Sequence, residues 1–144
     1  TIRLTERWVA EMVAGHIREH AAAEVARHRE AGARTVVLSA STNYGCEPVK
    51  RYLGMDDVIS TRLAVKDGLF TGELDGDYCY GPVKLTKAME YCIEHSLDME
   101  DAWYYGDAIA DLYIMERVGH PVCVTPDRKL RKEARRRRWE IVEW

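Results

Sequence analysis

Residues 102–107 read Ala-Trp-Tyr-Tyr-Gly-Asp, a short apolar and aromatic run that stops at a glycine and an aspartate. Such a run is typical of a strand, and the apolar residues of 109–118 predict that a helix follows. Residues 35–39, Thr-Val-Val-Leu-Ser, predict a second strand, which is covered on both faces because its apolar residues do not alternate with polar ones. The small polar residues of 39–45 predict a loop.

The rest of the chain alternates between helical and strand patterns. Further helices are expected over residues 1–31 with a break near Gly15, and over 47–53, 83–95 and 127–138; further strands are expected over 121–125 and 141–142. Asp67-Gly68 between two short apolar runs predicts a hairpin. Strands that alternate with helices predict an α/β fold, a parallel sheet with helices on its faces.

Composition narrows the classes of protein. The 144 residues are 47% hydrophobic, which excludes a disordered chain, and the length predicts one domain. A net charge of −3 argues against a nucleic-acid partner, and no apolar run reaches the ~20 residues of a membrane span. The four cysteines lack any C-x-x-C pair, which predicts free thiols and a cytoplasmic location.

The basic run at residues 128–138 is interpreted as the solvated face of a helix. No aromatic residue stands among its cations to stack on bases, so a nucleic-acid interface is not predicted. An acidic lipid or a phosphate-rich partner stays open as an alternative.

Ser39 ends the strand predicted over 35–39. Its hydroxyl and the backbone N–H groups of Ala40 and Ser41 are suited to hold a phosphate oxygen. In the alternative, which this segment alone favours, Ser41, Thr42 or Asn43 merely caps the next helix.

Asp107 and Asp111 stand four residues apart at the end of the strand predicted over 102–105. Two such carboxylates suit Mg²⁺; alternatively, Asp107 is an N-cap and Asp111 a first-turn acid. Two like charges at this spacing repel each other, and a bound cation would relieve that repulsion, so the metal-site interpretation is slightly favoured over the capping one. Lys84 stands at the start of a helix, where its charge opposes the helix dipole, so we expect an anion beside it: the Asp107 cluster or a ligand phosphate.

Taken in order, residues 36–41, 81–84, 105–107 and 111–112 resemble the motifs of the haloacid dehalogenase (HAD) superfamily, and within it the phosphoserine-phosphatase-like branch, subfamily IB. The resemblance covers about residues 27–144. It implies that residues 33–144 form a HAD-like Rossmannoid core, a three-layer α/β/α arrangement with a parallel sheet. Residues 1–32 would be the C-terminal part of a helical cap and its return helix.

The resemblance also implies a role for each matching residue. Ser39 would bind phosphate together with Ala40 and Ser41, and Lys84 would neutralise both the phosphate and the nucleophile. Asp107 would ligate Mg²⁺, with Asp111 holding the metal's waters or Lys84. The implied activity is Mg²⁺-dependent hydrolysis of a small phosphorylated metabolite through an aspartyl-phosphate, with phosphoserine as one candidate. No oligomeric state is implied.

The chain departs from the family pattern at its start. No Asp-x-Asp motif follows an apolar strand, and Asp75-Gly76-Asp77, which has the right spacing, is expected in a loop. We therefore expect the chain to be the C-terminal part of a longer protein, inactive by itself.

A second departure lies around Asp107. Ala108 and Ala110 replace small polar residues, and Tyr113 stands where proline is frequent. These changes leave open an alternative, a catalytically degenerate module that binds phosphate, metal or a protein partner.

Overall fold

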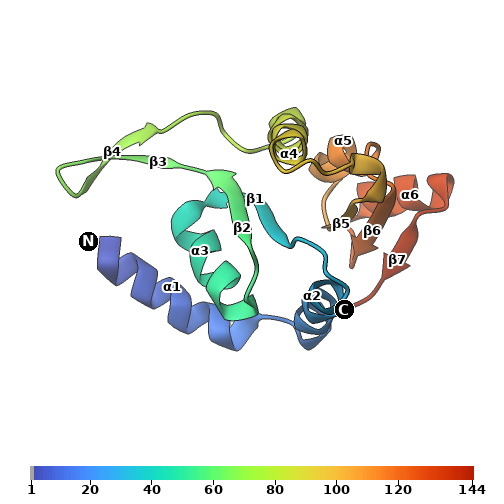
Figure 1. The fold of residues 1–144 in the computed structure, drawn as a ribbon, viewed down its shortest axis with the longest axis horizontal. Coiled ribbons are helices and arrows are strands. Elements are labelled where there is room, and N and C mark those ends of the chain that lie inside the picture. Colours follow the sequence, from blue (N-terminus) through green and yellow to red (C-terminus); the bar gives the residue numbers. More distant parts are fainter. Residues whose placement is uncertain (1) are drawn as a thin grey trace. The chain divides into compact units, whose positions relative to one another are not determined.

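The computed structural model describes residues 2–144, and within them every side chain except those of residues 2 and 5. The chain divides into two units, residues 1–79 and residues 80–144 (Figure 1). The boundary predicted between residues 32 and 33 is not tested by this division and stays a prediction.

The first unit begins with two helices, α1 (Ile2–His16) and α2 (Glu19–Glu30). The break predicted near Gly15 falls slightly later, because Arg18 is extended and starts α2. After α2 the chain turns at Gly32, whose φ of +83° is readily adopted by glycine. α1 packs along α3 (Asn43–Leu53), and Figure 1 shows the two helices side by side.

The loop predicted over residues 39–45 is wrong, because residues 39–42 belong to a strand and residues 43–45 to the following helix. Strand β1 runs over Val36–Thr42, and α3 begins at the next residue. β1 pairs in parallel with β2 (Asp57–Thr61); the register is regular as far as Leu38↔Ile59, then shifts and resumes at Thr42↔Thr61. The small polar residues therefore lie in an irregular stretch of strand, which depends on a partner far away in the sequence.

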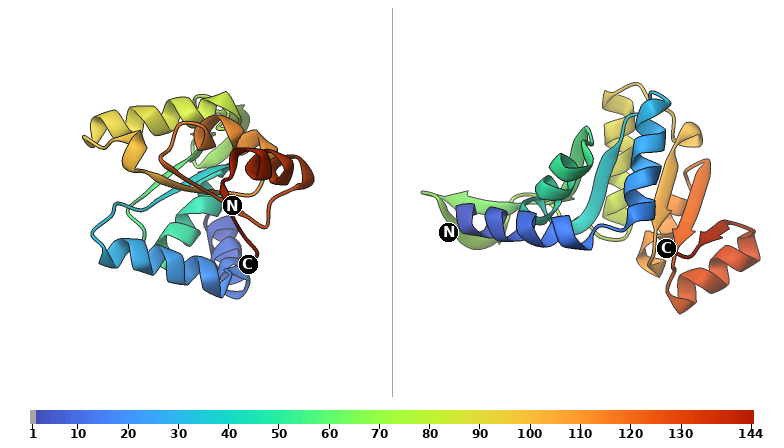
Figure 2. Two further views of the ribbon diagram at one scale, coloured as in Figure 1. Left: turned by 90° about the vertical axis from the view of Figure 1, so that its right-hand side faces the viewer. Right: turned by 90° about the horizontal axis from the view of Figure 1, so that it is seen from below.

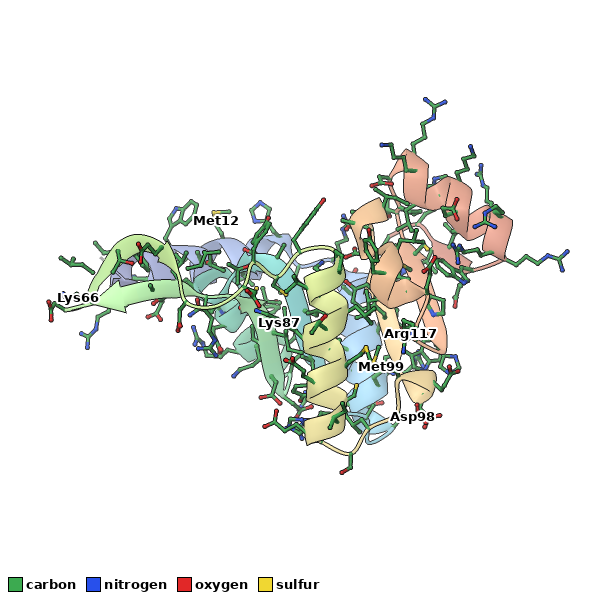
Figure 3. The ribbon with its side chains drawn as sticks, turned by 90° about the horizontal axis from the view of Figure 1, so that it is seen from above. Met12, Lys66, Lys87, Asp98, Met99 and Arg117 are labelled. Atoms are coloured by element: carbon green, nitrogen blue, oxygen red, sulfur yellow. The ribbon has the colours of Figure 1, made fainter. Side chains whose placement is uncertain are left out.

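The predicted hairpin is confirmed. β3 (Leu63–Lys66) and β4 (Leu69–Leu74) are antiparallel and joined by Asp67 and Gly68 at φ +52° and +77°. Positive φ at both positions is the signature of the tight turn that Asp-Gly favours. Figure 3 labels Lys66 at the tip of this hairpin.

The second unit holds a three-stranded parallel sheet in the order β5 (Trp103–Gly106), β6 (His120–Val124), β7 (Glu140–Val142). Figure 2 shows the three strands next to one another. The helices are α4 (Pro82–Glu94), α5 (Leu112–Met115) and α6 (Arg128–Arg137), with single 3₁₀ turns η1 (Met99–Asp101) and η2 (Ile109–Asp111). The parallel sheet predicted from the alternating pattern is confirmed. Its core includes the fully buried Met115, Cys123 and Leu130.

The helix predicted over residues 109–118 is shorter in the structure, a 3₁₀ turn followed by the four residues of α5. The chain turns at Gly119, whose N–H donates to the Met99 carbonyl oxygen at 3.0 Å. A Cβ at Gly119 would lie 1.7 Å from the carbonyl oxygen of Glu100, so this approach requires glycine.

Across residues 2–144, no helix combines the length and the apolar character needed to cross a membrane.

Candidate active site

The central feature of the second unit is a buried ion pair between Lys84 and Asp111. Lys84 lies in the first turn of α4, and its Nζ donates to Asp111 Oδ1 at 2.7 Å. The two side chains are 12% and 6% exposed. The anion expected beside Lys84 is therefore Asp111, whose charge offsets the unfavourable position of the ammonium at a helix N-terminus.

Tyr104 fixes the same carboxylate from the sheet. Its hydroxyl donates to Asp111 Oδ1 at 3.0 Å, so two donors from different elements meet at one oxygen. Gly106 leaves room for this arrangement, because a Cβ there would lie 2.9 Å from Asp111 Oδ2. Sequence reasoning missed Tyr104, since within an apolar run no local signal marks which aromatic residue faces the aspartate.

Asp107 is the residue that follows β5, and its side chain is exposed. It lies in a loop that is held in place by hydrogen bonds to another aspartate, Asp127. The Asp127 N–H donates to the Asp107 carbonyl oxygen at 2.8 Å, and the Asp127 carboxylate accepts from Ile109 N at 3.0 Å and from Leu130 N at 2.8 Å. Asp127 thus caps α6 and anchors the loop that carries Asp107. The alternative in which Asp107 itself is an N-cap is not what the structure shows, because Ala108 holds that position before η2.

The two predicted metal ligands differ in their surroundings. Asp107 is exposed, whereas Asp111 is 4% exposed and already accepts two hydrogen bonds at Oδ1. Among residues 2–144 no group of three or more His, Cys, Asp or Glu is placed to hold a metal ion. Mg²⁺ is commonly held by one or two carboxylates plus waters and substrate oxygens, and Asp107 fits that requirement. Metal binding by Asp107 and Asp111 stays a prediction.

Ser39 belongs to the first unit, in the irregular stretch of β1. Its Oγ accepts from Ser41 N at 3.1 Å, and Thr61 Oγ1 donates to the Ala40 carbonyl oxygen at 2.9 Å. The Thr61 hydroxyl in turn accepts from Cys79 N at 3.0 Å. Thr61, which sequence reasoning missed, therefore holds the shape of residues 39–41.

In the alternative prediction, one of residues 41–43 caps the next helix. The backbone of one of them does occupy the N-cap position, but the side chain of that residue does not cap the helix. Thr42 takes the N-cap position of α3, but its side chain makes no capping hydrogen bond. The N–H groups of the first turn are consequently not consumed by a Thr42 cap, and an anion is a suitable partner for such groups. Ser39 and Lys84 lie in different units, and their predicted grouping in one site stays a prediction.

Comparison with known proteins identifies the class. The family of haloacid dehalogenase-like hydrolases matches residues 1–116, and the chain belongs to this family. The chain is 38% identical over 129 residues to a Streptomyces azureus protein named "inhibition of morphological differentiation protein", which covers 89% of this chain and 46% of that protein. It is 39% identical over 120 residues to a probable phosphatase of Mycobacterium tuberculosis, covering 83% of this chain and 42% of the relative.

A phosphoserine phosphatase of M. tuberculosis is 29% identical over 143 residues, which cover 99% of this chain and 46% of that enzyme. The chain thus spans less than half the length of these curated relatives. Together with the family match, these relatives confirm the predicted place in the phosphoserine-phosphatase-like part of the superfamily.

Solved structures confirm the predicted fold class. A Bordetella pertussis protein of unknown function superposes with a TM-score of 0.88 at 23% identity, covering 96% of this chain and 63% of that one. A substrate-bound phosphoserine phosphatase superposes with a TM-score of 0.67 at 22% identity, covering 78% and 54%. At these identities the likeness establishes the HAD-type α/β fold.

Proposed function

We propose that this chain supplies the lysine, the carboxylates and the hydroxyl of a HAD-type phosphatase. The intact enzyme would hydrolyse small phosphorylated metabolites through an aspartyl-phosphate, with Mg²⁺ as cofactor. The observation that carries the proposal is the Lys84 ammonium, which is mostly buried and fixed by Asp111. A fixed cation in a site with little water interacts strongly with the charge that spreads over phosphate oxygens during transfer.

Lys84 retains hydrogen-bonding capacity for this role. An ammonium group has three donors, and the Asp111 contact uses one of them. Asp111 compensates for the burial of the cation, and the Tyr104 hydroxyl restrains Asp111. In this proposal Asp111 and Tyr104 are positioning residues, and Lys84 is the group that touches phosphate.

Ser39 and Asp107 complete the proposed set. Ser39 Oγ accepts a hydrogen bond from Ser41 N, so its own O–H proton is available for a phosphate oxygen. The Asp107 carboxylate is exposed on a loop that Asp127 anchors, which suits a ligand of Mg²⁺. When bound, the metal would supply positive charge to the phosphate.

The nucleophile is not assigned within this chain, and we propose that the 144 residues alone have no turnover. Asp75-Gly76-Asp77 follows β4, an exposed strand of an antiparallel hairpin, rather than the end of a parallel strand. Phosphoserine is the proposed first substrate to test, because one relative is a phosphoserine phosphatase. A reducing, cytoplasmic setting is proposed from the four free cysteines.

The test compares the 144-residue chain with a version extended upstream by an apolar strand that carries Asp-x-Asp. Hydrolysis of O-phosphoserine and of an aryl phosphate is followed with and without Mg²⁺. We expect no turnover from the shorter chain, Mg²⁺-dependent turnover from the longer one, and loss of turnover when its first Asp is replaced by Asn.

Mg²⁺-dependent hydrolysis by the 144-residue chain itself would contradict its proposed inactivity. An inactive longer protein that is folded and still binds inorganic phosphate would instead favour the degenerate module, which the alanines at 108 and 110 suggest.

A further inference from the structure

α6 presents a dense row of cations to solvent. Eight of the eleven residues 128–138 are Lys or Arg, and one is acidic. The apolar side of the helix faces the core, where Leu130 and Ala134 are fully buried. The opposite side carries five exposed cations at helical spacing: Arg128, Lys129, Lys132, Arg135 and Arg136. Figure 3 shows nitrogen-tipped side chains projecting around this helix.

Neighbouring acids neutralise only part of this charge. Within residues 2–144, three arginines of this run form ion pairs: Arg131 with Glu143, Arg136 with Glu133, and Arg137 with Glu116 and Glu133. No ion pair among residues 2–144 involves Lys132 or Arg135, although Arg135 also interacts electrostatically with the Glu143 carboxylate. The middle of the exposed face is therefore a strong local positive field on a chain whose net charge is −3.

A cavity of about 260 Å³ opens at the C-terminal end of α6. Arg138, which ends α6 in a left-handed conformation, lines this cavity together with Trp103, His120 and Trp139. Trp103 is 42% exposed, and its ring stacks on the His120 ring with 4.6 Å between centroids. The cavity therefore lies at the end of the basic run, where Arg138 is its cationic lining residue and Trp103, His120 and Trp139 are its aromatic ones.

The aromatic residues beside the basic run bear on whether residues 128–138 can bind a nucleic acid. No aromatic residue stands within residues 128–138, which is the sequence argument against a nucleic-acid partner. The fold nevertheless brings Trp103 from β5 and Trp139 from the start of the next segment to the end of the run. Cations that follow a backbone, with aromatic side chains beside them, are the two parts of a single-strand binding surface.

We propose that the exposed face of α6 and the adjoining cavity bind a single-stranded polynucleotide. Phosphates contact the cations of α6, and one unpaired base enters the cavity against Trp103 and Trp139. The ten residues of α6 rise about 15 Å, which matches about four phosphates of a stacked strand at about 3.4 Å spacing. The Glu140 carboxylate at the cavity wall can accept a hydrogen bond from a base N–H.

The apolar residues of α6 argue against a membrane surface as the partner. A helix that binds a bilayer inserts exposed apolar side chains between the lipids, whereas Leu130 and Ala134 are fully buried. The cavity is lined by Trp103 and Trp139, and aromatic rings of this kind are surfaces on which an unpaired base stacks. This inference concerns a surface of the second unit alone and does not depend on phosphatase activity.

The test measures binding of fluorescent uridine and deoxythymidine oligonucleotides of about 12 nucleotides to the 144-residue chain, with tryptophan quenching as a second signal. We expect a dissociation constant on the order of 10 µM at moderate salt. The logarithm of the binding constant should fall with the logarithm of salt with a slope of about −3, as about four phosphate contacts predict. A difference between the two oligonucleotides would show whether RNA or DNA is preferred.

Two variants separate the cations from the cavity. Lys132→Gln with Arg135→Gln should make the salt slope shallower by about 1.4, and Trp139→Leu should weaken binding about tenfold with little change in slope. Arg62→Gln with Lys66→Gln, two exposed cations of the first unit, is the matched control and should bind like the unmodified chain.

Three results would overturn the proposal. The first is no binding or quenching with the unmodified chain, an outcome that needs no variant to fold. The second is equal weakening by the control pair. The third is binding to vesicles that contain anionic phospholipid with no binding to either oligonucleotide, which would assign the surface to membranes.

Discussion

Replacing Asp111 by alanine should destabilise the second unit strongly. The change removes the carboxylate beside the Lys84 ammonium, which is only 12% exposed in the unmodified chain, and it removes the hydrogen bond from the Tyr104 hydroxyl to Asp111. Breaking a buried pair from one side costs about 3–5 kcal/mol, and we take about 3 kcal/mol because Lys84 retains some contact with water. If the free energy of unfolding falls by about 2 kcal/mol per M of urea, the urea midpoint should fall by about 1.5 M.

The assay is urea unfolding followed by circular dichroism and by tryptophan fluorescence, so that separate transitions of the two units are visible. The double variant Lys84→Met with Asp111→Ala removes both charges and should recover about 2 kcal/mol of the loss. Glu116→Ala breaks the more exposed Arg137 pair and is the matched control, with an expected cost below about 1 kcal/mol. A cost for Asp111→Ala no greater than that of the control, or effects of the two single variants that simply add in the double variant, would show that Lys84 and Asp111 are not coupled in this way.

Three further changes test the surroundings of this pair and the first unit. Gly106→Ala places a Cβ 2.9 Å from Asp111 Oδ2 and should cost about 2 kcal/mol in urea unfolding; an unchanged midpoint would show that the carboxylate moves freely. Asp127→Ala removes the cap of α6 and should cost about 1–2 kcal/mol, with Asp127→Asn keeping most of the stability. Burial, and then the neighbouring Arg27, lowers the pKa of His28, so the unfolded chain binds more protons than the folded one near the ordinary pKa of 6.5. Stability of the first unit should therefore fall as the pH drops through and below that value, and His28→Gln should flatten this dependence in unfolding measured between pH 5 and 8.

Local signals predicted the elements whose ends are set by nearby residues. β5 ends at Gly106 as its apolar run indicates, and the Asp67-Gly68 turn closes the expected hairpin. The extension of β1 to Thr42 was not predictable in this way, because the shifted pairing to Thr61 depends on β2. Amino-acid type at residues 39–42 indicates a loop, whereas pairing to a distant strand makes it a strand.

The candidate site was predictable in its residue types but not in its contacts. Lys84 at a helix N-terminus indicates a nearby anion, yet the sequence offers both Asp107 and Asp111 as its partner. Only the tertiary structure selects Asp111, and only the direction of Tyr104 on β5 shows the second donor to that carboxylate. Asp127 likewise acts across a gap of 18 residues when it accepts from Ile109 N.

In the proposed enzyme, the fixed Lys84 cation acts on phosphate. The most direct measurement is kcat/KM for O-phosphoserine in the version extended by the Asp-x-Asp strand, with Lys84→Met compared with Lys87→Met. Lys87 lies on α4 three residues away, is labelled in Figure 3, and serves as the matched control. We expect a loss of about 10²–10³ for Lys84→Met, with kcat/KM referred to the folded fraction because Asp111 is left buried without its cation, and a change of less than about threefold for Lys87→Met. Equal activity of the two variants would show that Lys84 does not act on phosphate.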